Sequence, residues 1–243
     1  MENYFSNLPA WVLLLFIPTF PITIYVISQI IKRGGIDAGL SQKQSKNIQY
    51  GIWGFFTIYL IYTFVLSQTG ILLENSLPPK VLVFTAIPLL IILLGFMFNK
   101  PLYDKILDKI PLESLIRIHL FRFVGLFFLI GAYYKTLPAH FAIIAGFGDI
   151  TTAIGAIFVS RWVIEQKSWR RKAIIIWNIL GLVDIISVII SAIHTTKTSI
   201  ENHTEGIVEM AKFPFIWIPA FAPAVIIFLH ISVFKKLKKD ASI

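Results

Sequence analysis

The chain of 243 residues is 56% hydrophobic and only 14% charged, with a net charge of +9 and a mean hydropathy of +0.77. Because a soluble globular domain carries about 25% charged residues, this composition excludes an ordinary soluble globule and favours a membrane protein. The absence of cysteine excludes disulfides, a thiol nucleophile and an iron–sulfur cluster. The basic residues lie in the gaps between apolar runs, which fits membrane topology better than nucleic-acid binding.

Seven apolar runs have roughly the 20 residues that a transmembrane helix needs. They cover residues 8–31, 50–67, 81–98, 115–134, 138–160, 173–194 and 213–234. The first run has neither a basic flank before it nor a cleavage site after it, so it is predicted to be a retained span rather than a signal peptide. The expected fold is therefore an all-α, polytopic bundle of about seven transmembrane helices.

Glycines and prolines mark the expected irregularities of the spans. The Gly34–Gly35 pair is predicted to break the chain in the polar linker after the first span. The last span contains Pro214, Pro219 and Pro223, which are expected to break it and leave carbonyls without partners. Broken membrane helices often line a binding site, although simple kinking would explain the prolines equally well.

The segment of residues 101–113, between the third and fourth spans, is too polar to cross a membrane. Leu102, Ile106 and Ile110 fall four residues apart and share one helical face, while charged residues occupy the others. This pattern predicts a helix that lies in the membrane interface.

Lysine and arginine are concentrated in the first, third and fifth loops and after the last span. By the positive-inside rule, the N-terminus is expected outside and the C-terminus inside. An odd number of spans agrees with this orientation. Because the chain has no internal repeat and no long linker, residues 1–243 are expected to form a single integral membrane domain.

Several polar residues fall inside the apolar spans, where such groups normally face protein or water. Asp149 and Asp184 lie about 11 and 12 residues from the inner ends of consecutive spans, which puts both carboxylates near the bilayer midplane. Small residues share the helical face of Asp149, so another helix can approach it closely. The sequence predicts one buried polar cluster, formed by Arg122, Asp149, Asn178, Asp184 and His230.

Two interpretations of this cluster stay open. It either locks the packing of the helices or provides a path for protons, an ion or a small solute. The working hypothesis is a small transport or proton/ion-coupled protein, and a non-transporting sensor or assembly protein is an alternative. No catalytic residue, cofactor or metal ligand is assigned, and the expected partners are the lipid bilayer and a small solute or proton, not nucleic acid.

Gly146-Phe147-Gly148-Asp149 resembles the GxGD motif of intramembrane aspartyl proteases such as presenilin and signal peptide peptidase. The resemblance implies that Asp149 shares a proton with a second carboxylate, here Asp184, and that the pair acts on one water. The chain departs from the family because Asp184 follows the motif instead of preceding it and has Val183 before it instead of tyrosine. These departures favour a protein that is not an enzyme, and the protease stays an alternative.

The histidines allow a third alternative, a b-haem redox protein. His119 and His230 are expected near the inner surface, and His140 and His194 near the outer one. A two-haem b-type cytochrome distributes its axial ligands in this way, and it needs facing imidazoles with room for the macrocycle. The chain lacks the paired histidines on one helix that are typical of the cytochrome b class.

The second half of the chain, from Arg117 to His230, also resembles a family of uncharacterised bacterial integral membrane proteins. The residues that carry the likeness are Leu137-Pro138, Phe141-Ala142, Ala145 to Asp149, Trp177-Asn178, Gly181, Asp184 and His230 at the end of the last helix. The resemblance implies a multi-pass protein of the bacterial inner, or cytoplasmic, membrane. It implies no activity.

Overall fold

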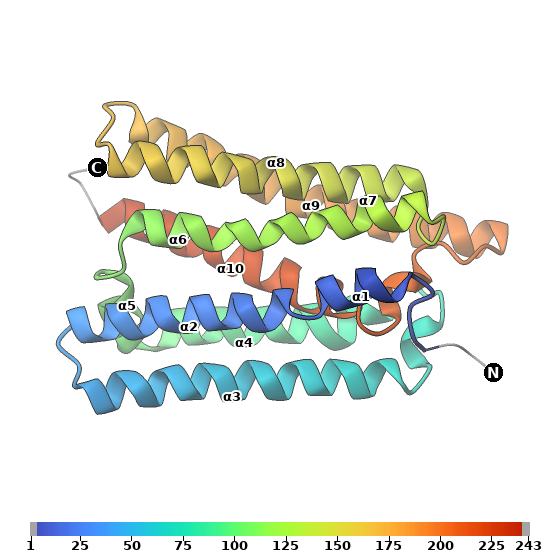
Figure 1. Cartoon of the computed structure of the whole chain (residues 1–243), viewed down its shortest axis with the longest axis horizontal. Helices are drawn as coiled ribbons and strands as arrows, with labels where there is room; N and C mark the ends of the chain where they lie inside the picture. The colour runs from blue at the N-terminus through green and yellow to red at the C-terminus, as the bar shows by residue number, and fades with distance from the viewer. Residues whose placement is uncertain (1–3, 240–243) are drawn as a thin grey trace.

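The computed structural model of the protein describes residues 4–239, which form one elongated bundle of side-by-side helices (Figure 1). Seven helical segments are long and apolar enough to cross a membrane. They are Ala10–Asp37, Gln42–Ser67, Leu82–Asn99, Leu112–Tyr133, Ala139–Ile164, Arg170–Asn202 and Trp217–Lys239. Among the described residues, the only β-type pairing is an isolated bridge between Phe5 and Phe213. The predicted all-α bundle with seven candidate spans is confirmed.

Some spans are built from several consecutive helical segments. The elements are α1 (Ala10–Phe16), α2 (Thr19–Asp37), α3 (Gln42–Ser67), the π-helical η2 (Leu82–Ala86), α4 (Ile87–Asn99), α6 (Leu112–Ile118), the 3₁₀-helical η3 (His119–Gly125), α7 (Leu126–Tyr133), α8 (Ala139–Ile164), α9 (Arg170–Asn202) and α10 (Trp217–Lys239). The connections contain the short elements η1 (Ile71–Leu73), α5 (Pro101–Leu107) and η4 (Val208–Ala211).

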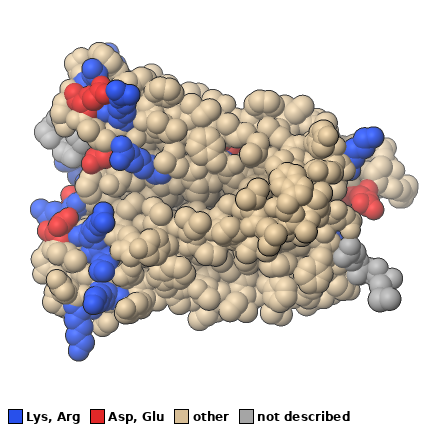
Figure 2. All heavy atoms as spheres, in the orientation of Figure 1, with Lys and Arg blue, Asp and Glu red and all other residues tan. Residues whose placement is uncertain are grey.

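Charged residues gather at the two ends of the bundle, and apolar surface lies between them (Figure 2). The end formed by the α2–α3 turn, α5, the α8–α9 loop and the last residues of α10 carries most of the lysine and arginine, and it is called the basic end below (Figures 1 and 2). The apolar surface between the ends exposes large side chains such as Leu14, Ile58 and Ile91. This distribution is typical of a protein that crosses a membrane more than once.

The predicted break at Gly34–Gly35 is wrong, because α2 continues through both glycines to Asp37. Gly34 lies against the α5 segment, which is α5 together with the residues that follow it up to Ile110. A Cβ on Gly34 would come within 2.5 Å of Ile110 Cγ1 and 3.2 Å of Ile106 Cγ2. The glycine therefore serves close packing between two helices rather than a turn.

The predicted break of the last span is also wrong, because α10 is continuous from Trp217 to Lys239. Pro214 precedes the helix, and Pro219 lies in its first turn, where backbone N–H groups have no intrahelical acceptor to lose. Pro223 is the one proline inside α10. The last span is also the most buried of the seven, with 72% of its apolar window inside the structure, so α10 forms the centre of the bundle.

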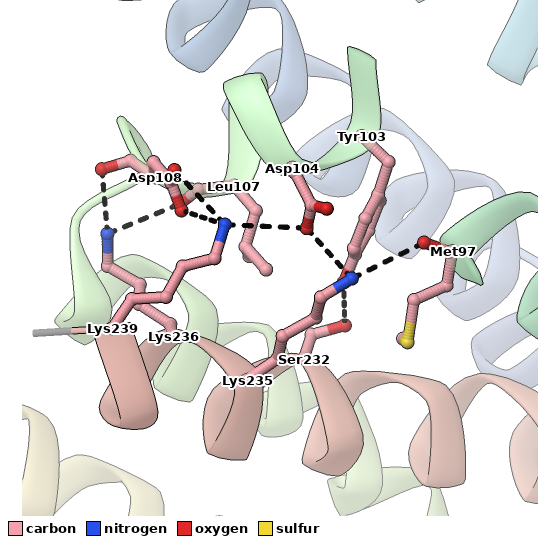
Figure 3. Close-up of polar contacts among 9 residues, drawn as sticks. All are labelled: Met97, Tyr103, Asp104, Leu107, Asp108, Ser232, Lys235, Lys236 and Lys239. Carbon is pink, nitrogen blue, oxygen red and sulfur yellow. Dashed lines mark hydrogen bonds and ion pairs between the residues drawn. The ribbon is translucent and has the colours of Figure 1, made fainter. Parts of the chain in front are cut away.

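The α5 segment lies at the basic end as an amphipathic helix, and its apolar face is partly as predicted. Ile106 and Ile110 are buried, whereas Leu102 is exposed. The polar side of α5 is held by the end of α10, where Asp104 Oδ1 lies 2.8 Å from Lys235 Nζ and both carboxylate oxygens of Asp108 accept hydrogen bonds from Lys239 (Figure 3).

Three further hydrogen bonds in Figure 3 join these elements. The Tyr103 hydroxyl donates to Ser232 Oγ at 2.7 Å, and Lys236 Nζ donates to the carbonyls of Leu107 and Asp108 at 3.2 and 3.1 Å. The segment is therefore clamped to the protein and does not lie free on the lipid surface.

A buried ion pair at the opposite end was not predicted from the sequence. Glu209 in η4 is 5% exposed, and its Oε2 lies 3.2 Å from Lys212 Nζ. Its Oε1 accepts hydrogen bonds from Ser6 Oγ and from the backbone N–H of Asn7. These contacts fasten the N-terminal segment to the loop between α9 and α10.

Candidate functional site

The fourth span changes from α-helix to 3₁₀-helix in its middle, over His119–Gly125. Side chains three residues apart lie on the same side of a 3₁₀-helix, so His119 and Arg122 project in the same direction. Arg122 is completely buried and heads the fully buried side chains by volume. A buried arginine at mid-span is costly unless neighbouring groups satisfy its charge and its five N–H donors.

The guanidinium of Arg122 is held by residues from the three following spans. Its Nε donates to Asp149 Oδ1 in α8 at 2.7 Å, and its Nη2 donates to Asp184 Oδ2 in α9. Its Nη1 donates to the carbonyl of Gly181 at 3.2 Å and lies 3.4 Å from His230 Nε2 in α10. One side chain thus links η3, α8, α9 and α10.

The hydrogen bonds of Asn178 fix the tautomer of His230. Asn178 Nδ2 lies 3.0 Å from the backbone carbonyl of His230, which can only accept, so the amide oxygen must be the atom that lies 2.7 Å from His230 Nδ1. Nδ1 then carries the proton and donates to Asn178 Oδ1. Nε2 keeps a lone pair and is an acceptor for Arg122 Nη1.

Glycines make room for these side chains. A Cβ at Gly148 would overlap the carboxylate of Asp184, and a Cβ at Gly181 would overlap the imidazole ring of His230. At Gly125 a Cβ would come within 2.5 Å of Asp149 Cβ. Both glycines of the Gly-Phe-Gly-Asp motif in α8 therefore serve packing, Gly148 against the carboxylate of Asp184 in α9 and Gly146 against Leu129 in α7.

The structure brings together all five residues predicted for the polar cluster, namely Arg122, Asp149, Asn178, Asp184 and His230. Four of them are almost inaccessible, whereas the side chain of Asp184 is 13% exposed, against 4% for Asp149. With Arg122 protonated, both aspartates ionised and the imidazole of His230 neutral, the cluster carries a formal charge of −1. A buried excess charge of this kind is costly in a membrane-embedded protein.

His119 was not predicted as part of the cluster. It was expected near the inner surface, but its ring packs on that of His230, with centroids 4.2 Å apart and planes tilted by 36°, and it makes a T-shaped contact with Trp177 at 5.0 Å. Its two ring nitrogens are buried without a hydrogen-bond partner. The three-residue spacing to Arg122 was visible in the sequence, but it indicates a shared face only once the local 3₁₀ conformation is known.

The same stack argues against the haem alternative for the inner pair of histidines. Because the rings of His119 and His230 lie in contact, no macrocycle fits between them. In the outer pair, His140 Nε2 is already engaged with a protein group, 2.9 Å from Thr195 Oγ1.

The aspartyl protease alternative meets a different obstacle. Catalysis by two carboxylates needs them to share a proton around one water. Here the guanidinium of Arg122 lies between Asp149 and Asp184 and binds both. The arrangement therefore pairs each acid with a cation instead of with the other acid.

Fold and site together define a multi-pass, membrane-type helical bundle with a buried arginine–carboxylate cluster at its centre. The chain belongs to the family described as "Domain of unknown function (DUF8737)", which matches residues 77–238. The matched region contains every residue of the cluster. The comparison with curated proteins found no match, and neither did the comparison with solved structures.

Proposed function

We propose that the protein transports a proton or a small monovalent cation across the bacterial inner membrane. The observation that carries this proposal is the excess of one carboxylate over one guanidinium in the buried cluster of Arg122, Asp149 and Asp184. Ionisable groups inside transmembrane bundles commonly mark ion or proton pathways.

The charge excess gives the cluster a defined chemical capacity. Removing a charge from water costs several kcal/mol even after relaxation, so one bound proton or monovalent cation stabilises the cluster by neutralising it. Asp184 is the natural acceptor because its side chain is more exposed than that of Asp149. The Arg122–Asp149 pair would then remain as a balanced ion pair.

Binding and release of a proton or cation at Asp184 would change contacts that join several helices. Protonation weakens the ion pair between Asp184 and Arg122, and the guanidinium also holds Gly181 and His230. The short 3₁₀ segment that carries Arg122 is a type of irregularity often found where helices hinge. A ligand that favours one state of such a cluster shifts the populations of the helix arrangements.

Two further features support transport. A small surface pocket of about 60 Å³ lies at the end opposite the basic end, and it is lined by residues of η2, α9, η4 and α10, including Leu82, Thr196 and Pro219. Two of these elements, α9 and α10, also build the cluster. The basic end fits the cytoplasmic side under the positive-inside rule, which corresponds to an outer N-terminus and an inner C-terminus.

The test is ion flux into proteoliposomes driven by an imposed potential, followed with a pH-sensitive dye inside for protons and, in a parallel preparation, with a sodium-sensitive dye for sodium. We expect proton or sodium flux in the wild type and its loss in Asp184→Asn and Asp149→Asn. Glu165→Gln, which changes a carboxylate in the α8–α9 loop, is the matched control and should keep the flux. A wild type that carries neither ion, with Asp149→Asn changing only thermal stability, would overturn the proposal in favour of a structural lock.

A further inference from the structure

His119 is the one member of the central group whose polar atoms the described chain leaves unmatched. It is 0% exposed, and neither Nδ1 nor Nε2 has a hydrogen-bond partner. A neutral imidazole always carries one N–H donor and one acceptor, and buried polar groups are nearly always paired. A buried imidazole with two unmatched nitrogens therefore calls for a partner from outside the chain.

The protein groups around His119 are already engaged. In η3, Arg122 binds the two carboxylates, and in α10, His230 uses Nδ1 for Asn178 and Nε2 for Arg122. In α9, the indole N–H of Trp177 donates to the carbonyl of Thr152 in α8 at 3.0 Å. The aromatic neighbours contact His119 by ring faces and edges, which fixes the ring but satisfies neither nitrogen.

Packing alone does not account for a histidine at this position. A phenyl ring would fill the stack on His230 and Trp177 with no polar atom to satisfy. Imidazole differs from phenyl in having one ring nitrogen that donates a hydrogen bond and one that accepts a hydrogen bond or a proton. The extra chemistry, not the shape, distinguishes the residue.

We propose that His119 is a proton-exchange site that binds a water molecule and connects the Arg122 cluster to the basic end. In one transfer, a water on the basic-end side gives a proton to the ring nitrogen that carries none, and the N–H of the other nitrogen passes its proton to a second water on the side of the Arg122 cluster, so the ring returns to its neutral form. This inference deepens the proposed function and rests on it for the direction of proton movement.

The position of His119 along its span supports this route. It follows directly on α6, the part of the span that leads to the basic end. Two residues earlier, exposed Arg117 donates through Nε to the buried hydroxyl of Ser160 at 3.3 Å. Polar groups thus occur on the basic-end side of His119, in a span that is otherwise apolar.

The experiment uses full-length protein in lipid bilayers and two readouts. The first is solid-state NMR of ¹⁵N-histidine-labelled protein, in which the His119 signal is identified by its loss in His119→Phe. We expect a magnetisation-transfer peak between a His119 nitrogen and water protons. The absence of this peak in the wild type would overturn the water site whether or not the protein transports ions.

The second readout is the proton flux described above. His119→Phe keeps the ring but removes both nitrogens, and we expect it to lower the flux by roughly 100-fold, the usual scale for losing an acid–base group, without lowering the melting temperature. His140→Phe makes the same change at an exposed imidazole outside the cluster and should leave the flux unchanged. If His119→Phe does not fold, His119→Gln replaces it, since glutamine keeps polar atoms but cannot relay a proton in this way.

The outcomes separate this inference from the proposed function. Wild-type flux in His119→Phe or His119→Gln, together with loss of flux in Asp184→Asn, would refute the role of His119 and leave transport standing. A wild type without flux would refute transport, and the water peak alone would then decide whether His119 holds water.

Discussion

Replacing Arg122 with methionine is expected to destabilise the protein by about 3–5 kcal/mol, the usual cost of removing one partner of a buried ion pair. A similar figure, about 3–6 kcal/mol, follows from two charged contacts. The guanidinium makes charged hydrogen bonds to Asp149 and Asp184, and each such bond contributes about 1.5–3 kcal/mol. Methionine also leaves two neighbouring carboxylates without a cation between them.

The reasoning can be checked by adding two substitutions to the first. In the triple variant with Asp149→Asn and Asp184→Asn no charge remains in the cluster, so it should be more stable than Arg122→Met alone, although not as stable as the wild type. The assay is reversible unfolding in mixed lipid–detergent micelles, followed by helix content. A single variant within about 1 kcal/mol of the wild type, or a triple variant less stable than the single one, would refute the ion-pair account.

Three further predictions concern Gly148, Asp104 and Glu209. Gly148→Ala should cost about 1–3 kcal/mol in thermal unfolding, because the new Cβ would overlap the carboxylate of Asp184. Gly54→Ala is the control, and it should be neutral or stabilising because nothing lies within 4 Å of its Cβ. The hydrogen bond and ion pair with Lys235 lower the pKa of Asp104. The stability that this pair gives the folded protein is therefore present above the unfolded-state pKa of Asp104 and is lost as the pH falls through its folded-state pKa. Because this pair is half-exposed, the loss should stay below about 1 kcal/mol. It should appear as faster hydrogen exchange in α5 at acid pH, and Asp104→Asn should abolish the pH effect. Glu209→Gln should cost about 1–3 kcal/mol and make the N-terminal segment more sensitive to limited proteolysis.

The spans and the cluster were predictable for different physical reasons. Lipid requires long apolar helices, so hydropathy alone predicts seven spans. The constant rise of an α-helix then converts sequence position into depth, which predicts that Asp149 and Asp184 lie at a similar height. Because a buried charge needs a partner, Arg122, the deeper of the two arginines in the neighbouring span, was the expected counter-ion.

The features that were missed depend on neighbours that no local pattern reveals. Gly34 reads as a turn until the α5 segment is seen to approach it. The side chain of Glu209 binds Ser6, which is 203 positions away in the sequence, so no helical period connects them. His119 reads as an interfacial residue until its segment is known to be a 3₁₀-helix. Each miss arises from tertiary contact or from local backbone geometry rather than from composition.

The two interpretations of the cluster differ most sharply at Asp184. If the cluster is only a structural lock, both carboxylates are permanent partners of Arg122, and neutralising either one should destabilise the protein by a similar amount. If Asp184 exchanges a proton or cation, Asp184→Asn loses the charged hydrogen bond to Arg122 but also removes the excess negative charge and leaves the balanced Arg122–Asp149 pair, so the two effects should offset each other to within about 1 kcal/mol.

Asp149→Asn removes the more deeply buried partner and should cost about 3 kcal/mol or more. Unfolding of the two variants side by side at neutral pH measures this difference. Equal losses at the two positions would mean that the charge excess is fixed in the fold, and the exchange of a proton or cation at Asp184 would then have no basis.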